Sequence, residues 1–376
     1  MNVIFTCGGT GGHINPAIAV ANALKERHPD CNILFIGCIG EMEEKLVPKA
    51  GFPIKTVQCA GFSRKLDKNG IKWNIKAIGI IRRAIKSCRQ IIADFKPDVI
   101  VGTGGFASYP TMKAGSAMGI PVMVHEANAV PGLTTKTIAA KATKVMVSFE
   151  ESAQYYHHPE RVEAVGMPVR REFITTNKAE ARAKLGLDQR PVVVTAFGSL
   201  GAKAMNQMVA DLMKLEQEAG YPFQHIHATG AGGFKWMPEH LKELGVCYND
   251  GKGLDLREYI YDMPTVMAAA DVIISRAGAS TCNEIAASGT PCILIPSPNV
   301  TNNHQEKNAR VLEKRGAAIV VCEPDCTAEG VFRTIQELLS HDQRRKDMSV
   351  ALRNMAVLDS AERICTMIEE LAAPKG

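Results

Sequence analysis

The sequence predicts an α/β protein that consists of two doubly wound domains, each built on a parallel sheet. Short apolar, β-branched runs alternate with helix-length segments along the whole chain, which is typical of parallel strands that are buried on both faces. Glycine-rich turns follow several of these runs, and the series is interrupted once, near Val165–Arg190. A chain of 376 residues is long enough for two to three domains of about 150 residues each.

The strands can be placed in order along the chain. In the first half we expect strands at Asn2–Phe5, Asn32–Ile36, Ile54–Val57, Asp98–Val101, Pro121–His125 and Lys144–Val147. In the second half we expect them at Val192–Phe197, His225–Ala228, Asp271–Ser275, Cys292–Pro296 and Ala317–Val321. Helix-length segments separate the strands, as βαβ units require.

Gly166, Met167 and Pro168 interrupt the pattern between the two series. This break predicts a first domain over residues 1–165 and a second over 166–340, with a linker around Gly166–Val169. A final helical stretch covers about His341–Leu371, and we expect it to cross back to the first domain.

Composition and charge exclude several classes of protein. The hydrophobic content of 46% and the charged content of 22% exclude wholesale disorder. A net charge of +5 is too small for a dedicated nucleic-acid binder but suits a protein that meets phosphates or an anionic surface. We expect neither a signal peptide nor a transmembrane helix.

The cysteines and acidic residues predict no metal site. The 11 cysteines are odd in number, and several lie within apolar runs, as reduced core cysteines of a cytosolic protein do. The chain has no CxxC pair for a structural zinc ion and no DxD motif for a metal that bridges a diphosphate.

Three loops of the first domain follow strands that would end at one edge of a sheet. They are Gly8–His13, Gly102–Pro110 (with Gly104, Gly105, Ser108 and Tyr109) and His125–Gly132. Glycine loops let backbone N–H groups approach a phosphate, so a crevice between two such loops suits a diphosphate. Tight turns that need glycine only for packing are the alternative interpretation.

The first loop departs from the dinucleotide-binding fingerprint. Gly9 and Gly11 fit the GxGxxG spacing, but Ile14 takes the place of the third glycine. The strand that ends at Ile36-Gly37 also lacks the terminal acid that would hold a ribose. Both departures argue against a nicotinamide cofactor.

Two loops of the second domain point to a nucleotide. Phe197–Ala202 and Arg276–Glu284 each link a strand to a helix, and a helix N-terminus can bind a pyrophosphate. Ser280 or Thr281 could cap the second of these helices. Glu284 lies about one turn into it, where its carboxylate could accept both hydroxyls of a ribose, but it could equally be the glutamate of a capping box that begins at Thr281. Asn302–Ala309 offers clustered amides for sugar hydroxyls, or it is a plain polar helix start.

A basic and apolar segment precedes the second glycine loop. Nine Lys and Arg residues lie between Arg64 and Arg89, against the single acid Asp67. Interleaved with them are Ile71, Trp73, Ile75, Ile78, Ile80, Ile81 and Ile85. This composition is typical of a segment that docks on an anionic membrane surface, and Lys72, Trp73, Lys76, Arg82 and Arg83 are its candidate contacts. The alternative is an amphipathic core helix with a solvated basic face.

Taken together, these motifs resemble the MurG family of peptidoglycan glycosyltransferases. The matching pieces run in order along the whole chain: Gly8–His13, Gly104–Pro110, His125–Asn128, Gly166–Arg170, Gly198–Ala202, Arg276–Pro291 and His304–Ala309. The resemblance implies the GT-B fold, in which two Rossmann-like domains face each other across a cleft. Two positions depart from the family pattern, because Leu200 replaces a glutamine and His304 stands where some members have a second glutamine.

The resemblance also implies a reaction. The family moves N-acetylglucosamine (GlcNAc), with inversion, from its UDP donor to the 4-hydroxyl of N-acetylmuramic acid (MurNAc) in undecaprenyl-pyrophosphoryl-MurNAc-pentapeptide (lipid I), which gives lipid II. It implies no cofactor, and it implies a peripheral enzyme on the anionic inner face of the cell membrane, with other cell-wall synthesis proteins as further partners. Family motifs carry the donor contacts over to Thr10, Gly11, Gly12, Asn128, Arg170, Ser199, Ile260, Ala279, Ser280, Thr281, Cys282, Asn283, Glu284 and Gln305.

An inverting transfer requires a base for the acceptor hydroxyl and stabilisation of the leaving UDP. His13 and Glu126 are the candidate bases, and His13 could instead contact a phosphate. Arg170, Arg276 and the helix N-terminus at Ser280 could stabilise the leaving charge.

A UDP-GlcNAc 2-epimerase of similar fold is the main alternative function, because it shares the donor but needs no membrane surface. A nucleotide-binding module without activity and an NAD dehydrogenase are weaker alternatives.

Overall fold

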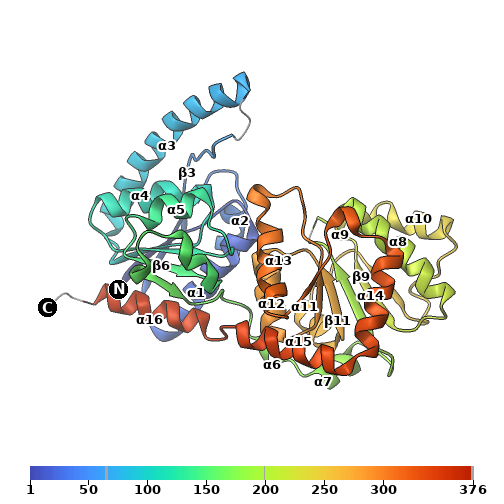
Figure 1. Cartoon of the computed structure of the whole chain (residues 1–376). Helices are drawn as coiled ribbons and strands as arrows, with labels where there is room; N and C mark the ends of the chain where they lie inside the picture. Colours follow the sequence, from blue (N-terminus) through green and yellow to red (C-terminus); the bar gives the residue numbers. More distant parts are fainter. Residues whose placement is uncertain (64–66, 199, 374–376) are drawn as a thin grey trace. The chain divides into compact units, whose positions relative to one another are not determined.

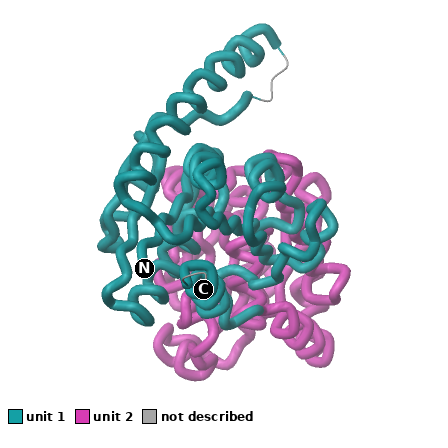
Figure 2. Tube along the Cα trace, turned by 90° about the vertical axis from the view of Figure 1, so that its left-hand side faces the viewer, with its two compact units in different colours: residues 1–169, 357–376 teal, residues 170–356 magenta. Residues whose placement is uncertain are grey.

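The computed structural model describes residues 1–63, 67–198 and 200–373, which form two compact units. Unit 1 contains Met1–Val169 and Val357–Gly376, and unit 2 contains Arg170–Ala356 (Figure 2). The boundary lies four residues later than the sequence suggested. Gly166 explains the shift, because a Cβ on this residue would lie 2.5 Å from Cβ of Val357 in the returning chain, so the expected linker is packed into unit 1.

Unit 1 is a seven-stranded parallel sheet with strand order β3-β2-β1-β4-β5-β6-β7 (Figure 1). Its strands are β1 (Asn2–Thr6), β2 (Asn32–Cys38), β3 (Ile54–Val57), β4 (Val99–Gly102), β5 (Val122–Glu126), β6 (Lys144–Val147) and β7 (Val162–Ala164). Its helices are α1 (Gly11–Arg27), α2 (Glu43–Lys49), α3 (Lys68–Phe95), α4 (Tyr109–Ala117), α5 (Leu133–Ala139) and α16 (Ser360–Ala372), with 3₁₀ turns at Phe106–Ser108, Glu150–Tyr155 and Pro159–Arg161.

Two hydrophobic layers cover the faces of this sheet, because successive side chains of a strand point to opposite faces. In β1, Val3 and Phe5 pack in the layer that contains the buried residues of α1 and α16. Ile4, between them, packs in the layer that contains the buried residues of α3, α4 and α5. The rings of Phe5 and Phe35 stack with centroids 5.4 Å apart, which ties β1 to β2.

Unit 2 is a six-stranded parallel sheet with strand order β10-β9-β8-β11-β12-β13. Its strands are β8 (Val192–Ala196), β9 (Gln224–Ala228), β10 (Leu254–Arg257), β11 (Val272–Ser275), β12 (Cys292–Leu294) and β13 (Ile319–Val320). Its helices are α6 (Glu172–Thr175), α7 (Lys178–Lys184), α8 (Lys203–Glu218), α9 (Gly230–Phe234), α10 (Met237–Glu243), α11 (Met263–Ala269), α12 (Ala279–Ser288), α13 (His304–Lys314), α14 (Ala328–Ser340) and α15 (Asp342–Met355), with 3₁₀ turns at Thr301–Asn303 and Glu323–Asp325.

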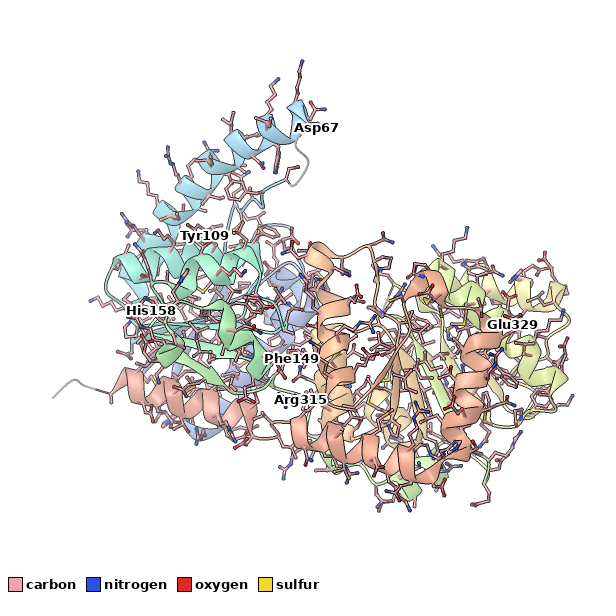
Figure 3. All side chains as sticks on the ribbon, viewed as in Figure 1. Asp67, Tyr109, Phe149, His158, Arg315 and Glu329 are labelled. Carbon is pink, nitrogen blue, oxygen red and sulfur yellow. The ribbon has the colours of Figure 1, made fainter. Side chains whose placement is uncertain are left out.

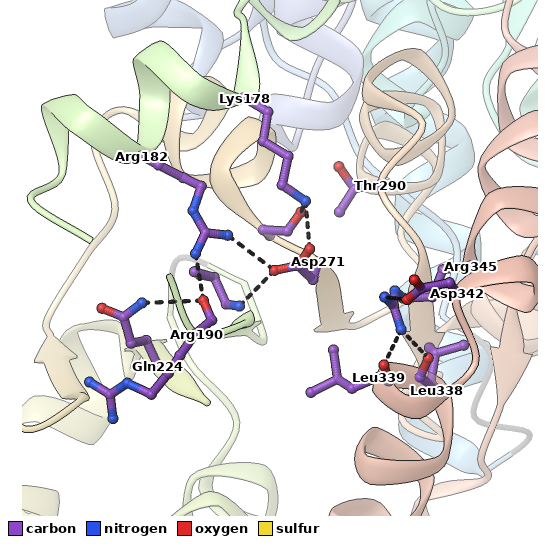
Figure 4. A network of polar contacts seen from close by, with 12 residues as sticks. Lys178, Arg182, Arg190, Gln224, Asp271, Thr290, Leu338, Leu339, Asp342 and Arg345 are labelled. Carbon is purple, nitrogen blue, oxygen red and sulfur yellow. Dashed lines mark hydrogen bonds and ion pairs between the residues drawn. The ribbon is translucent and has the colours of Figure 1, made fainter. Parts of the chain in front are cut away.

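A polar network joins the start of unit 2 to its sheet (Figure 4). Asp271, just before β11, accepts hydrogen bonds from Lys178 Nζ at 2.6 Å and Arg182 Nη1 at 3.2 Å. The same carboxylate accepts the backbone N–H of Val192 at 2.8 Å. One partly buried acid thus fixes α7 against the beginnings of the two central strands.

Every strand expected from the sequence is present, and two strands were missed. β7 and β10 are edge strands with the sequences Val-Glu-Ala and Leu-Asp-Leu-Arg, so they lack the continuous apolar run of a central strand. The final helical stretch is also corrected. It is broken into α15, which belongs to unit 2, and α16, which packs on α1 of unit 1.

Helix α3 combines both interpretations of the basic segment. Its C-terminal half is a core helix, since Ala84, Cys88 and Ile92 are buried in the unit 1 core. Its N-terminal half extends beyond the body of unit 1 (Figure 2) and begins at Asp67, labelled in Figure 3, whose carboxylate caps the helix by accepting the N–H of Gly70 at 2.7 Å.

The apolar residues of α3 therefore divide into two groups. Ile71, Trp73, Ile75 and Ile78 are exposed, with Ile75 reaching 68%. Ile80 is buried and Ile81 and Ile85 are partly buried, so these three are removed from the expected exposed set. Arg64 and Lys65 lie outside the described residues.

Candidate active site

In unit 1, the first two glycine loops meet at the carboxyl ends of β1 and β4, the neighbouring strands from which the chain runs in opposite directions across the sheet. Gly105 has φ +82°, and a Cβ there would lie 2.3 Å from the carbonyl oxygen of Gly8, so only glycine fits this contact. Open α/β sheets bind ligands at such a switch point. The structure therefore brings together the loops that the sequence assigned to a common crevice.

His13 is fixed between these loops by reciprocal contacts with Thr103. The ring Nδ1 of His13 lies 3.0 Å from the Thr103 carbonyl oxygen, and the Thr103 hydroxyl donates to the His13 carbonyl at 2.6 Å. A carbonyl can only accept, so Nδ1 carries the proton and the basic lone pair of the neutral ring is on Nε2. This tautomer is the one that a general base at Nε2 requires.

Glu126 at the end of β5 organises the third loop. Its Oε1 accepts from the backbone N–H of Asn128 at 3.0 Å and from the Asn128 side chain at 3.1 Å. Its Oε2 accepts from the N–H of Gly132, the residue before α5, at 3.0 Å. The carboxylate is buried and both of its oxygens hold the loop, so we retain only His13 as the candidate base.

Ser108 has a structural role that corrects its expected contact with a ligand. Its side chain is buried, and its hydroxyl donates to the carbonyl oxygen of Gly105 at 2.8 Å. Tyr109 begins α4 and is partly exposed (labelled in Figure 3). Gly104 lies against the His13 ring, since a Cβ there would be 2.9 Å from Nδ1.

In unit 2, the corresponding switch point lies between β8 and β11. Helix α12 follows β11 directly, with Gly278 as the N-cap residue and no side-chain hydrogen bond at the cap within the described part of the chain. The first N–H groups of a helix have no intrahelical acceptor, so those of Ala279, Ser280 and Thr281 form a site suited to a phosphate. The expectation that Ser280 or Thr281 caps this helix is wrong.

Glu284 is therefore not part of a capping box, because that motif would require Thr281 as the N-cap. Burial raises the pKa of the Glu284 carboxyl to about 7, and the positive charge of Arg170 opposes this shift. Helix α6, which follows Arg170, packs against α12 and so keeps the exposed guanidinium near the carboxylate. Glu284 is thus a half-buried acid near the middle of α12, and its pKa is shifted toward neutrality. Such a group is typical of a functional site.

Several expected donor contacts are modified by their surroundings. The Cys282 side chain is buried and its N–H bonds to the Gly278 carbonyl at 2.9 Å, so this residue belongs to the core. The Asn283 amide donates to the carbonyl of Ala279 at 2.9 Å. Ile260 has a buried side chain, which leaves its backbone groups for any ligand, and Ser199 lies outside the described residues.

The second domain also positions Gln305 and Arg276. Gln305 Oε1 accepts the N–H of Ser297 at 2.8 Å, which holds the loop after β12 against the start of α13. Arg276 forms an ion pair with Glu323 at 2.5 Å and donates to the Ile295 carbonyl at 3.1 Å. Because Arg276 is already neutralised, Arg170 is the better candidate to stabilise a leaving diphosphate.

The sequence did not reveal a fully buried polar network beneath the loop after β8. The Thr195 hydroxyl lies 2.7 Å from both His225 Nε2 and His227 Nδ1, and His225 Nδ1 lies 2.9 Å from Glu216. Burial lowers the pKa of His227 to about 3, so its ring is neutral. Polar residues alternate with apolar ones in β9, and only the tertiary structure shows that His225 contacts Glu216 of α8 while both histidines contact Thr195 of β8.

Two Rossmann-like units, each with glycine loops at the switch point of its sheet, define a protein of the GT-B architecture. Residues 3–147 match the glycosyltransferase family 28 N-terminal domain, and residues 192–364 match the family 28 C-terminal domain. The chain belongs to this family and, within it, to the group of MurG-type N-acetylglucosamine transferases.

Full-length relatives support this assignment. The chain is 38% identical over 376 residues to the UDP-N-acetylglucosamine--N-acetylmuramyl-(pentapeptide) pyrophosphoryl-undecaprenol N-acetylglucosamine transferase of Acetivibrio thermocellus, covering 100% of this chain and 99% of the relative. It is 35% identical to the enzyme of the same name from Bacillus subtilis, with 99% of both chains covered. The crystal structure of Acinetobacter baumannii MurG superposes with a TM-score of 0.77 at 26% identity, over 98% of this chain and 99% of that one.

The epimerase alternative shares the fold alone. The UDP-GlcNAc 2-epimerase of Neisseria meningitidis has a TM-score of 0.66 with this chain, but the two are 16% identical, over 98% of this chain and 100% of that one. The Acetivibrio thermocellus and Bacillus subtilis relatives, at 38% and 35% identity over the full chain, are both named as transferases.

Proposed function

We propose that this protein transfers GlcNAc from UDP-GlcNAc to the 4-hydroxyl of MurNAc in lipid I, with inversion, and so makes lipid II for peptidoglycan synthesis. The observation that supports this most strongly is the full-length similarity to transferases named for this donor and acceptor. The loops at the two switch points add a physical basis, since each sheet offers backbone N–H groups where a phosphate would bind.

The donor contacts proposed in unit 2 come from the family motifs, and the start of α12, which no described side chain caps, supports the diphosphate contact. The N–H groups of Ala279, Ser280 and Thr281 would bind the UDP diphosphate at the positive end of the α12 dipole. The Glu284 carboxylate would accept the two ribose hydroxyls, and backbone groups of Ile260 would contact the base. Arg170 would stabilise the charge that develops on the leaving UDP, and Gln305 would contact the sugar.

Unit 1 would supply the base and the acceptor loops. His13 Nε2 takes the proton from the acceptor hydroxyl as its oxygen bonds to C1 of GlcNAc, while the bond from C1 to the diphosphate oxygen breaks and UDP leaves. Gly104, Gly105 and Tyr109 would lie at the acceptor diphosphate. Thr10, Gly11, Gly12 and Asn128 remain the proposed donor contacts of this unit.

A UDP-release assay tests the proposed function. We expect UDP to be released from UDP-GlcNAc only when a lipid I analogue is present, together with a disaccharide product detectable by mass spectrometry. An acceptor without the muramoyl 4-hydroxyl is the matched control and should give no product. UDP release or conversion of UDP-GlcNAc to its 2-epimer without acceptor would contradict the proposal and favour the epimerase.

We also propose that the protein docks on the anionic inner face of the cell membrane through the N-terminal half of α3. Among the described residues, no helix has both the length and the apolar composition that a membrane span requires. Exposed Ile71, Trp73, Ile75 and Ile78 lie beside exposed Lys72 and Lys76 on this projecting half-helix, and exposed Arg82 and Arg83 follow one turn later. Apolar insertion together with charge attraction is the combination that peripheral docking needs.

Reversing Lys72, Lys76, Arg82 and Arg83 to glutamate is expected to abolish co-sedimentation with anionic vesicles, because each basic residue near such a surface contributes about 1 kcal/mol. Trp73→Ala should weaken binding further at high salt, where charge attraction is screened. Turnover of a soluble short-chain acceptor should survive both changes.

The matched control reverses four exposed lysines of unit 2, Lys214, Lys235, Lys242 and Lys346, which changes the net charge equally. That variant should still bind vesicles. Vesicle binding that is lost in both variants, or in neither, would show that the docking surface lies elsewhere.

A further inference from the structure

Glu43, the first residue of α2, carries a carboxylate that is completely buried. Its Oε1 accepts the backbone N–H of Cys38 at 2.9 Å, and its Oε2 accepts the backbone N–H of Gly9 at 3.1 Å. One donor is the last residue of β2 and the other lies in the glycine loop that follows β1, so the side chain joins the first loop to the neighbouring strand. None of the ion pairs formed by the described residues involves Glu43, although a buried carboxylate without a cation is costly.

The surrounding backbone is shaped around this carboxylate. A Cβ on Gly8 would lie 2.4 Å from Glu43 Oε1, and a Cβ on Gly37 would lie 2.5 Å from Glu43 Cγ. Two glycines at the ends of two strands therefore leave room for one acidic side chain. Contact with Glu43 is therefore sufficient to require glycine at position 8, the first glycine of the first loop, whether or not a ligand is bound.

The position of Glu43 in α2 does not account for these contacts. An acid in the first turn is stabilised by the helix dipole, but Glu43 does not cap its own helix, because both of its hydrogen bonds go to other segments. The next residue, Glu44, shows the ordinary arrangement, since its exposed carboxylate accepts the N–H of Gly40 in the adjacent turn at 2.9 Å.

Glu43 fixes the first loop through Gly9. Because the Gly9 N–H points to Glu43, the N–H groups that the loop can offer to a ligand are those at the start of α1, at Gly11 and Gly12. His13 follows in the same turn and is held by Thr103 of the second loop. The buried carboxylate thus holds the loop that leads into the helix start and the candidate base.

We propose that Glu43 is a positioning residue for the transfer reaction: its two carboxylate oxygens hold Gly9 and Cys38 so that the loop leading into α1 keeps His13 in the reactive geometry toward the acceptor. This inference rests on the proposed function for the identity of the acceptor. It requires a carboxylate of this length. Glutamine would place an NH₂ group against one of the two backbone N–H donors, and aspartate is one methylene too short to reach both.

The test compares Glu43→Gln with Glu44→Gln, the same change one residue later. We expect Glu43→Gln to lower kcat/KM for a soluble lipid I analogue by about a hundredfold, the effect of misplacing reacting groups by roughly 1 Å. The Kd for UDP, whose ribose and diphosphate contacts are proposed in unit 2, should change far less than kcat/KM. Amide hydrogen exchange should accelerate at Gly9–Ile14 and remain unchanged in α16. Glu44→Gln should resemble the wild type in every measurement.

The outcomes separate this inference from the proposed function. If wild-type protein gives no product with the lipid I analogue, the proposed function fails, and exchange at Gly9–Ile14 still tests whether Glu43 holds the loop. If the wild type is active and Glu43→Gln retains its kcat/KM or its exchange rate at Gly9–Ile14, the role of Glu43 is refuted. A loss of kcat/KM that comes with an equal loss of UDP binding and a lower Tm would show a general folding role and also refute it.

Discussion

Replacement of His13 by alanine is expected to lower kcat by about 10²–10⁴-fold, the usual contribution of a general base. The reason is the tautomer fixed by Thr103, whose carbonyl lies 3.0 Å from Nδ1 and so leaves the basic lone pair on Nε2. The Kd for UDP should change little, because His13 is not among the proposed donor contacts. Steady-state kinetics with a soluble lipid I analogue and calorimetric titration with UDP measure both quantities.

The control for this experiment is His28→Ala, at the other end of the same helix. His28 follows the C-terminal end of α1, whereas the first glycine loop precedes its N-terminal end. The His28 ring lies 2.9 Å from the Glu369 carboxylate on α16. This variant should keep the wild-type kcat. A His13→Ala variant that also keeps near wild-type kcat would remove His13 from the mechanism, whereas a raised KM for the acceptor with unchanged kcat would assign it to phosphate binding.

Replacement of Glu284 by alanine is expected to weaken the binding of UDP and UDP-GlcNAc alike, by about tenfold to a hundredfold. Both ligands carry the ribose, and the loss of a charged hydrogen-bond partner costs roughly 1.5–3 kcal/mol. Glu218→Ala, an exposed acid at the end of α8 in the same unit, is the control and should bind UDP as the wild type does. Wild-type UDP affinity in a folded Glu284→Ala protein would exclude the ribose contact.

The pH dependence of UDP binding gives a second readout for Glu284. Since burial raises the pKa of this carboxyl to about 7, the charged form that accepts two hydroxyls predominates only above that pH. UDP affinity should therefore fall as the pH drops below about 7, by at most the roughly tenfold to hundredfold expected for loss of the carboxylate, and Glu284→Gln should remove this part of the pH dependence.

The raised pKa of Glu284 makes the folded protein less stable as the pH rises, whereas the same rise in pH makes UDP binding stronger. An acid whose pKa is raised by folding stabilises the protein at low pH, and this contribution is lost as the pH rises from the ordinary carboxyl range through about 7. Glu284→Gln should remove that loss from the free energy of unfolding, measured by urea denaturation at several pH values.

The sequence by itself determined the fold class, the order of the central strands along the chain and the loops that matter. These features are local, because a β-branched run, a glycine turn and a helix-length segment each lie within a few tens of consecutive residues. The family was also recognisable from such loops in order. The loops of unit 1 meet as expected because the carboxyl ends of parallel strands share one edge of a sheet.

Only the tertiary structure decided the role of each polar side chain. Glu126 looked like a candidate base and Ser108 like a ligand contact because they lie in candidate loops. Glu126 instead accepts hydrogen bonds from Asn128 and Gly132 of its own loop, and Ser108 donates to the Gly105 carbonyl. Glu43 gave no signal in the sequence, because its two partners are 34 and 5 residues away. Whether Ile75 of α3 is exposed while Ile80 is buried depends on where the helix leaves the body of unit 1. Even partners only two to six residues away, as for Glu126 and Ser108, depend on the path that the backbone takes in the fold. The packing of neighbouring elements depends on that path as well, and no local pattern of residues encodes it.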